Sequence, residues 1–152
     1  MEWDEYVAAG RQKRIAEQKH IPTITARMSI EEQGRSSCGP GWNELLIALD
    51  ADLALIDPKY TIQQYKEKWG ALCFHAMPSD QSLREPFYAR IKEAQEKSLT
   101  ICEICGKPGS LSKKYPIQTV CNEHWASVSP EKQTTTVIEL LKSLQRKLNH
   151  KK

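Results

Sequence analysis

The chain has 152 residues, a length that suits a single domain. Its formal net charge is +3, and 27% of its residues are charged. No apolar run reaches the roughly 18 residues of a membrane span, and the opening MEWDEY lacks the basic start and apolar centre of a signal peptide. Five cysteines, an odd number, favour a reducing compartment over a disulfide framework. We therefore expect a soluble, cytoplasmic protein without a membrane partner.

Charge is distributed unevenly along the chain. Residues 1–58 contain 6 basic and 10 acidic residues, a net −4, whereas residues 59–152 contain 16 basic and 9 acidic residues, a net +7. A basic C-terminal half permits contact with nucleic acid or with an acidic protein surface, but many ordinary soluble proteins share this property. Charge alone therefore leaves the class of partner open.

The first residues predict a helix followed by a loop. Residues 2–19 begin with acidic and end with basic side chains, as the helix dipole favours, and Gly10 makes the helix marginal. We expect this helix to dock on the body or on a partner through a ragged apolar stripe of Trp3, Tyr6, Val7 and Ile15. Residues 20–41 are rich in glycine, proline and serine and lack periodicity, which is typical of an irregular loop.

The most regular pattern before the cysteines predicts a helix over residues 42–56. Asp57-Pro58 ends this helix, since the residue before a proline disfavours the helical conformation. Asp50 and Asp52 point in different directions on it, so we expect a solvated face and no acid pair. The apolar positions recur at helical spacing and are Leu45, Leu46, Leu49, Leu53 and Ile56.

Residues 60–76 predict a β-hairpin with its turn at Trp69-Gly70, because apolar and polar residues alternate on the returning strand. A helix follows near Pro86, preceded by a capping box at Ser82 and Glu85. This helix leads directly into a cysteine-rich segment. Its expected inward stripe comprises Leu83, Phe87, Ile91 and Ala94.

Residues 101–125 contain the pattern on which the functional prediction depends. Cys102-x-x-Cys105 is followed, after 15 residues, by Cys121-x-x-His124. Two ligand pairs with two-residue gaps are typical of a tetrahedral zinc site, and Gly106 suits the knuckle turn after the first pair. Four protein ligands close the coordination shell, so the pattern favours a structural Zn²⁺ over a catalytic one.

The residues around the ligands support a structural interpretation. Glu103 and Glu123 are expected to be solvated knuckle residues and not general bases. A zinc deaminase would place His-x-Glu before its Cys-x-x-Cys, and this sequence has no His-x-Glu. The open alternative is that the thiols stay reduced and His124 lies on the surface without a metal.

Between the two ligand pairs, turns at Pro108-Gly109 and Lys113-Lys114 predict a short hairpin, and the second pair opens a helical turn. The expected apolar strand positions are Tyr115, Ile117 and Val120. Knuckle, hairpin and helix start over residues 101–125 resemble the treble-clef zinc fingers of DksA/TraR-type regulators. His124 departs from that pattern, in which a fourth cysteine stands.

Residues 129–152 predict an amphipathic terminal helix. Ser129-Pro130-Glu131 combines a hydroxyl cap, a proline in the first turn and a carboxylate at the positive end of the dipole. This helix either docks on the core or offers its apolar edge to a partner or a second copy, which would give a homodimer. Its apolar positions are Val137, Leu140, Leu141, Leu144 and Leu148.

The ordered segments within residues 38–125 resemble a family of small bacterial and phage-encoded proteins. The matching segments are CGPGWNELLIALDADL, then QYKEKWGALCF, then CEICGKPG and CNEHW. The resemblance implies a helix, a hairpin and a zinc finger in this order. By analogy with phage-encoded proteins, it also implies a host or defence protein as the partner, but it implies no activity.

Three classes of function remain open from the sequence. We expect a non-enzymatic, zinc-stabilised regulator that binds another protein, because the sequence contains no phosphate loop, triad or carboxylate cluster. An enzyme would need Cys38 as a nucleophile with His75 or His20 as its base, and nothing in the spacing brings them together. The alternative is a nucleic-acid-binding zinc-finger protein, with amines and rings from two hairpins: Lys66, Lys68, Trp69, Lys107, Lys113, Lys114 and Tyr115.

Together the predicted elements define an α+β fold in a small single domain. Residues 1–37 form an N-terminal helix and loop, and residues 38–128 form an α+β core with the zinc finger at 101–125. Residues 129–152 form the C-terminal amphipathic helix.

Overall fold

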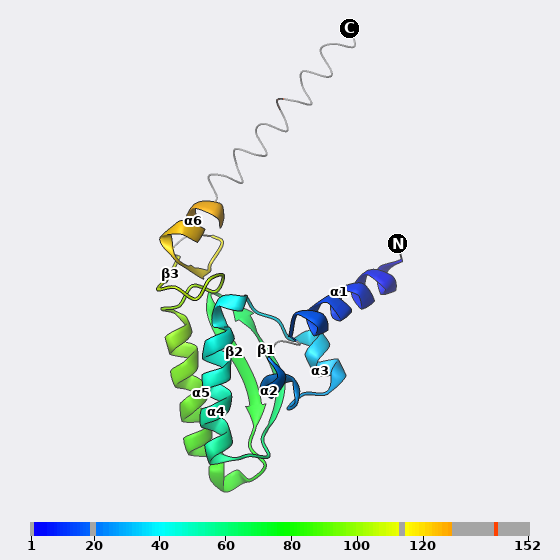
Figure 1. Cartoon of the computed structure of the whole chain (residues 1–152), viewed down its shortest axis with the longest axis vertical. Helices are drawn as coiled ribbons and strands as arrows, with labels where there is room; N and C mark the ends of the chain where they lie inside the picture. Colours follow the sequence, from blue (N-terminus) through cyan, green and yellow to red (C-terminus); the bar gives the residue numbers. More distant parts are fainter. Residues whose placement is uncertain (1, 19–20, 113–114, 129–141, 143–152) are drawn as a thin grey trace.

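The computed structural model describes residues 2–18, 21–112, 115–128 and 142. The fold is α+β, as predicted, with two antiparallel hairpins among its helices (Figure 1). The predicted terminal helix at 129–152 lies outside the described residues, except for Lys142. The elements, in chain order, are α1 (Trp3–Gln18), α2 (Pro22–Thr25), α3 (Ile30–Arg35), the 3-10 helix η1 (Pro40–Trp42), α4 (Asn43–Ile56), β1 (Thr61–Lys68), β2 (Ala71–Met77), the 3-10 helix η2 (Gln81–Leu83), α5 (Arg84–Ser98), β3 (Ser110–Leu111), β4 (Thr119–Val120) and α6 (Asn122–Val128).

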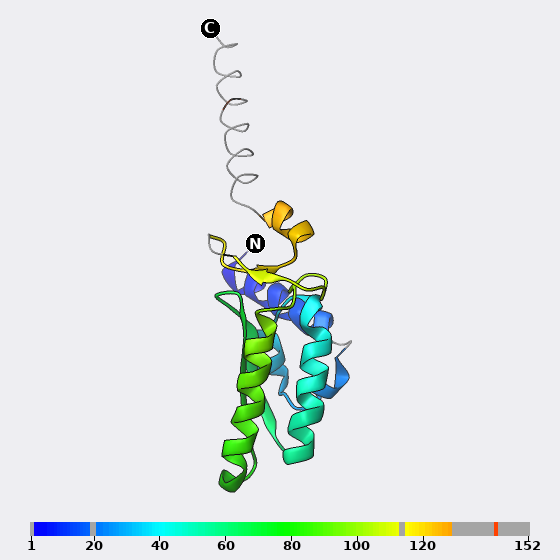
Figure 2. The same cartoon turned by 90° about the vertical axis from the view of Figure 1, so that its left-hand side faces the viewer.

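The core lies between the β1–β2 hairpin and the helices α4 and α5, which run side by side along it (Figure 1, Figure 2). Apolar residues on β2 alternate inward as predicted, and the stripe of α4 is buried except at its half-buried end. Burial of this apolar surface is the main favourable term in folding. The largest fully buried side chains are Trp42, Tyr60, Tyr65 and Phe87.

The prediction of a loop over residues 20–41 was wrong, because α2, α3 and η1 occupy most of it. Ile21 and Ile24 are 3% and 0% exposed and belong to the core. Ser29 begins α3 with a capping box: its hydroxyl accepts the Glu32 N–H at 3.2 Å, and the Glu32 carboxylate accepts the Ser29 N–H at 2.7 Å. Helices of four and six residues are too short to show a periodic pattern.

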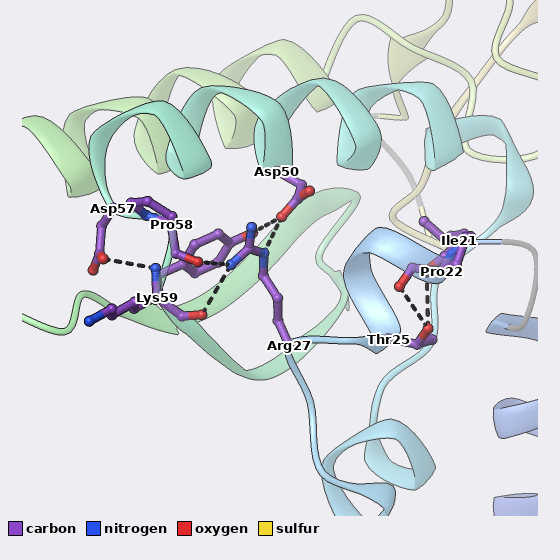
Figure 3. A network of polar contacts seen from close by, with 9 residues as sticks. Ile21, Pro22, Thr25, Arg27, Asp50, Asp57, Pro58 and Lys59 are labelled. Carbon is purple, nitrogen blue, oxygen red and sulfur yellow. Dashed lines mark hydrogen bonds and ion pairs between the residues drawn. The ribbon is translucent and has the colours of Figure 1, made fainter.

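The predicted solvation of Asp50 was also wrong, since Asp50 is 6% exposed. Arg27 Nε and the Tyr60 hydroxyl both donate to Asp50 Oδ1 at 2.5 Å, and Figure 3 shows this network. Burial, together with the hydrogen bond to Asp50, raises the pKa of Tyr60, so Tyr60 stays the proton donor. Arg27 therefore fastens the α2–α3 segment to α4. Asp52 is exposed, as predicted.

Side chains cover both edges of the β1–β2 sheet. On the β2 edge, Ser98 Oγ accepts the Leu72 N–H at 2.9 Å, and Gln95 accepts the next outward N–H at 3.1 Å. On the β1 edge, Ser36 Oγ accepts the Tyr65 N–H at 3.2 Å. These bonds satisfy N–H groups that an open sheet edge would leave unpaired.

The helix α5 begins differently from the prediction. The capping box at Ser82 and Glu85 does not form, because Asp80 caps the preceding 3-10 turn by accepting the Ser82 N–H at 2.8 Å. α5 then begins at Arg84 without a side-chain cap. Among the described residues, no helix has both the length and the hydropathy needed to cross a membrane.

The helix α1 forms as predicted and packs on α3. Gly34 of α3 is buried, and a Cβ at this position would lie 2.3 Å from Arg11 Cγ. The N-terminal half of α1 projects away from the body (Figure 1). Its aromatic side chains Trp3 and Tyr6 are 74% and 64% exposed, and their rings stack at 5.9 Å.

Candidate metal centre

The structure brings the four predicted ligands together at one end of the fold. The ligand atoms of Cys102, Cys105, Cys121 and His124 all lie within 4.8 Å of one another. His124 Nδ1 lies 3.6 Å from Cys102 Sγ and 3.3 Å from Cys121 Sγ, while Cys105 Sγ lies 3.8 Å from Cys121 Sγ. A tetrahedral zinc ion would require S···S and S···N separations of about 3.8 and 3.5 Å. These three separations lie close to those values, so the four side chains could hold a metal ion.

Local structure explains how each ligand pair reaches the centre. Cys102 and Cys105 lie on a turn after α5, where Gly106 adopts a φ of +78° and donates its N–H to the Cys102 carbonyl at 2.9 Å. Such a positive φ favours glycine, as the sequence predicts. Cys121 follows β4 directly, and His124 lies on the first turn of α6. The helical turn predicted at the second ligand pair is confirmed.

The hairpin between the ligand pairs is shorter than predicted. Its strands pair only Ser110 with Val120 and Leu111 with Thr119. Tyr115 is 77% exposed and, like Ile117, lies outside the strands, so the strand positions assigned to both were wrong.

Backbone N–H groups lower the pKa of the Cys102 thiol. Burial raises the pKa of its thiol, but the N–H groups of Cys105, Cys121 and Ile104, with the imidazole of His124, outweigh burial and lower this pKa to about 6. Hydrogen bonds to sulfur favour the thiolate, which is the form that binds metal. The thiolate form of Cys102 is thus stabilised although the residue is buried.

A hydrogen-bonded contact joins the knuckle to the segment before α4. The Glu103 carboxylate accepts the Gly39 N–H at 2.9 Å, and the Glu103 carbonyl accepts the Gly41 N–H at 2.7 Å. The buried indole of Trp42 donates to the Ile101 carbonyl at 2.9 Å. Glu103 is therefore a partly buried structural residue, and its predicted solvation was wrong.

Both glycines are needed because two backbones approach closely here. A Cβ on Gly39 would lie 2.3 Å from the Glu103 carbonyl oxygen, and a Cβ on Gly41 would lie 2.1 Å from the Cys102 carbonyl oxygen. Real Cβ atoms do not tolerate such separations from backbone. The GPG sequence in front of Trp42 was the signal that could have indicated this packing.

A second contact joins the finger to the turn of the β1–β2 hairpin. The buried Thr119 hydroxyl donates to the Gly70 carbonyl at 2.7 Å. A Cβ on Gly70 would lie 2.2 Å from Leu111 Cδ1. The finger hairpin therefore lies against the hairpin turn, an arrangement visible in Figure 2.

The residues predicted to bind nucleic acid are only partly brought together. Trp69 is 71% exposed and Lys68 is exposed, whereas Lys66 is half-buried on β1. Of the β1–β2 turn, Gly70 contacts the finger hairpin. Lys107 lies on the knuckle and pairs with the exposed Glu123 of α6 at 3.6 Å. Lys113 and Lys114 lie outside the described residues.

The thiol and imidazole proposed for an enzyme are not paired. Burial, and to a lesser extent Glu103, raises the pKa of Cys38 to about 12. His75 Nε2 instead lies 3.0 Å from Cys73 Sγ on the same strand. His20 lies outside the described residues. A neutral, partly buried Cys38 is a poor nucleophile.

Comparison with models of protein families, with curated proteins and with solved structures gives no match to this chain. The class of site is therefore defined by its own residues: three cysteines and one histidine that could hold a metal ion.

Proposed function

We propose that this chain is a non-enzymatic, zinc-stabilised binding protein that regulates another protein by direct contact. The observation that supports the proposal is the closed set of four ligands, which is fastened to the rest of the fold through Glu103 and Thr119. A metal with four protein ligands has no open position for substrate, so its role is to hold the surrounding chain in place.

Zinc is the metal that these residues suit best. Three thiolates and one imidazole form a soft, tetrahedral donor set, which is typical of structural zinc. Knuckle, short hairpin and helix follow one another as in a treble clef, and the metal would connect the knuckle to α6. The chemistry that zinc supplies is coordination alone.

The helix α1 supports a protein as the partner. Its exposed side chains Trp3, Tyr6 and Val7 have the spacing of one helical face, and the first two are large aromatics. Exposed aromatic residues of this kind dominate the binding energy of protein interfaces. An amphipathic helix typically lays such a face in a groove of its partner. A reducing, cytoplasmic setting would keep the thiols available for zinc.

The test is affinity purification of the tagged chain from its native host, with nuclease treatment and quantitative mass spectrometry. We expect a protein that co-purifies with the wild type and is lost from the double variant Trp3→Ser/Tyr6→Ser. Leu55→Ser, which removes an 87% exposed side chain from α4, is the matched control and should retain the partner. The proposal would be overturned if every co-purifying protein were recovered equally with the wild type, the double variant and Leu55→Ser.

A further inference from the structure

We propose that the exposed face of α4 is a docking surface for the chain's own C-terminal segment, residues 129–152. This α4 stripe consists of Ile47, Ala48, Ala51 and Leu55. It belongs to a different helix from the aromatic face of α1, so the inference does not rest on the function proposed above.

The helix α4 presents apolar side chains to solvent as well as to the core. Ile47, Ala51 and Leu55 follow one another at intervals of four residues, so they lie in one row along the helix. Ile47 and Leu55 are 46% and 87% exposed, and Ala48 is exposed beside them. The solvent side of an ordinary surface helix is polar, and a helix that is apolar all round is normally buried. The α4 stripe is therefore the kind of surface that another segment covers.

The charges on α4 favour a basic occupant. Its exposed charged residues are Glu44 and Asp52, and residues 43–56 contain no lysine or arginine. Residues 129–152 contain six lysine or arginine residues against two glutamates, which gives a net charge of +4. Opposite charges at the rim of an apolar contact fix its register and speed its formation. The terminal segment therefore complements α4 in charge.

The terminal segment also has the apolar pattern of a docking helix. Its apolar residues recur at intervals of four, three and four, which predicts a single stripe over about three helical turns. Two helices that pack through such rows bury both stripes. Alanines in the α4 row leave room for the longer side chains of the segment. The recurring positions are Val137, Leu141, Leu144 and Leu148.

The described chain ends close to the point where α4 begins. α6 ends at Val128, four residues beyond His124. His124 Nδ1 lies 3.6 Å from Cys102 Sγ, and a Cβ on Gly41 would lie 2.1 Å from the Cys102 carbonyl oxygen. α4 begins two residues after Gly41, at the finger end of the molecule (Figure 1, Figure 2). The segment that follows α6 therefore starts within reach of α4.

The terminal segment is long enough to run along the whole of α4. At about 1.5 Å per residue, the 14 residues of α4 span about 21 Å, and 24 terminal residues in a helix would span about 36 Å. The excess leaves several residues for the chain to turn back after α6. A segment on so short a tether has an effective concentration of about millimolar, which favours it over an untethered partner or a second copy.

Hydrogen exchange of the zinc-loaded full chain tests the proposal. Peptide mass spectrometry measures the exchange rate of the backbone amides of residues 137–148. Docking should protect these amides, and the double variant Ile47→Ser/Leu55→Ser should speed their exchange at least about tenfold. Ile30→Ser, which removes a 66% exposed side chain from α3, is the matched control and should leave the rate unchanged. The amides of β2 should stay protected in every form, which shows that the fold is intact.

A photo-crosslinker distinguishes the terminal segment from other occupants. With benzoylphenylalanine replacing Leu55, irradiation should join α4 to a peptide from residues 129–152 of the same chain, at a yield that does not change with protein concentration. The proposal is overturned if residues 137–148 exchange as fast in the wild type as in the double variant, which would leave the α4 stripe to an external partner. It is also overturned if the crosslinks join two chains, since the occupant would then be a second copy.

Discussion

The carboxylate of Glu103 accepts the backbone N–H of Gly39 at 2.9 Å, across 64 positions of sequence. Glu103 lies between the two cysteines of the first ligand pair, and Gly39 lies immediately before the 3-10 turn that leads into α4. The metal-binding knuckle and the entry into the main helix are therefore one structural unit. Whatever stabilises the knuckle also stabilises the segment around Cys38.

Removal of the metal should expose Cys38. With zinc bound, burial and a pKa of about 12 keep this thiol neutral and slow to react at pH 7.5. Chelation should free the knuckle, release Gly39 and Gly41, and speed labelling of Cys38 by iodoacetamide at least about tenfold. Peptide mass spectrometry with and without chelator measures this rate. Cys73, which lies on β2 away from the knuckle, is the internal control, and equal acceleration of both thiols would indicate global unfolding instead of this coupling.

Gly41→Ala should destabilise the fold by more than about 1 kcal/mol, since its Cβ would collide with the Cys102 carbonyl oxygen. Gly10→Ala is the matched control. It lies within α1, where alanine should stabilise the helix by about 0.5–1 kcal/mol. Urea unfolding in excess zinc measures both changes. If Gly41→Ala unfolds at the wild-type urea concentration, the close packing of these backbones is not present in solution.

Asp50→Ala should cost about 3–5 kcal/mol, because it leaves the largely buried charge of Arg27 unpaired. Asp52→Ala removes an exposed carboxylate from the same helix and should change stability by less than about 0.5 kcal/mol. Urea unfolding of the two variants gives the comparison. Similar small effects would mean that Asp50 is solvated after all.

Acid should remove the contribution of Asp57 to the free energy of unfolding. The backbone N–H of Ser79 at 2.6 Å lowers the pKa of this carboxyl below its ordinary 3.8, against the opposing effect of burial. The folded pKa is thus below the unfolded one, so the stabilisation is complete well above pH 3.8 and is lost as pH falls through the folded pKa. Asp57→Asn should be less stable than the wild type at pH 6, and the gap should close at lower pH.

Urea midpoints of both proteins between pH 6 and about pH 3 test this expectation. The difference between them isolates Asp57, because acid weakens metal binding equally in both. A gap that stays constant over this range would refute the assignment.

The elements that the sequence predicts well are long and strongly patterned. α4 repeats leucine over several turns, and β2 alternates buried and exposed side chains around a Trp-Gly turn. The ligands were also predictable, since two chelating pairs with fixed gaps can be recognised without knowledge of the fold. The separations of the ligand atoms and the choice of Nδ1 on His124 follow from the fold and not from the spacing.

Long-range contacts explain what the sequence did not predict. The burial of Asp50 depends on its ion pair with Arg27. Arg27 lies between α2 and α3, and these two helices are too short to show a periodic pattern. Ser36 and Ser98 are fully buried only because they cover sheet edges. The contact of Glu103 with Gly39 likewise depends on two backbones meeting, which no local pattern encodes.

Metal content tests the central claim most directly. Inductively coupled plasma mass spectrometry of the purified chain should find one zinc ion per chain, since four ligands form a single closed site. Cys102→Ser and His124→Ala should lose most of it, while Cys38→Ser should retain it. Purified wild type without zinc, or full zinc retained in Cys102→Ser, would contradict the account.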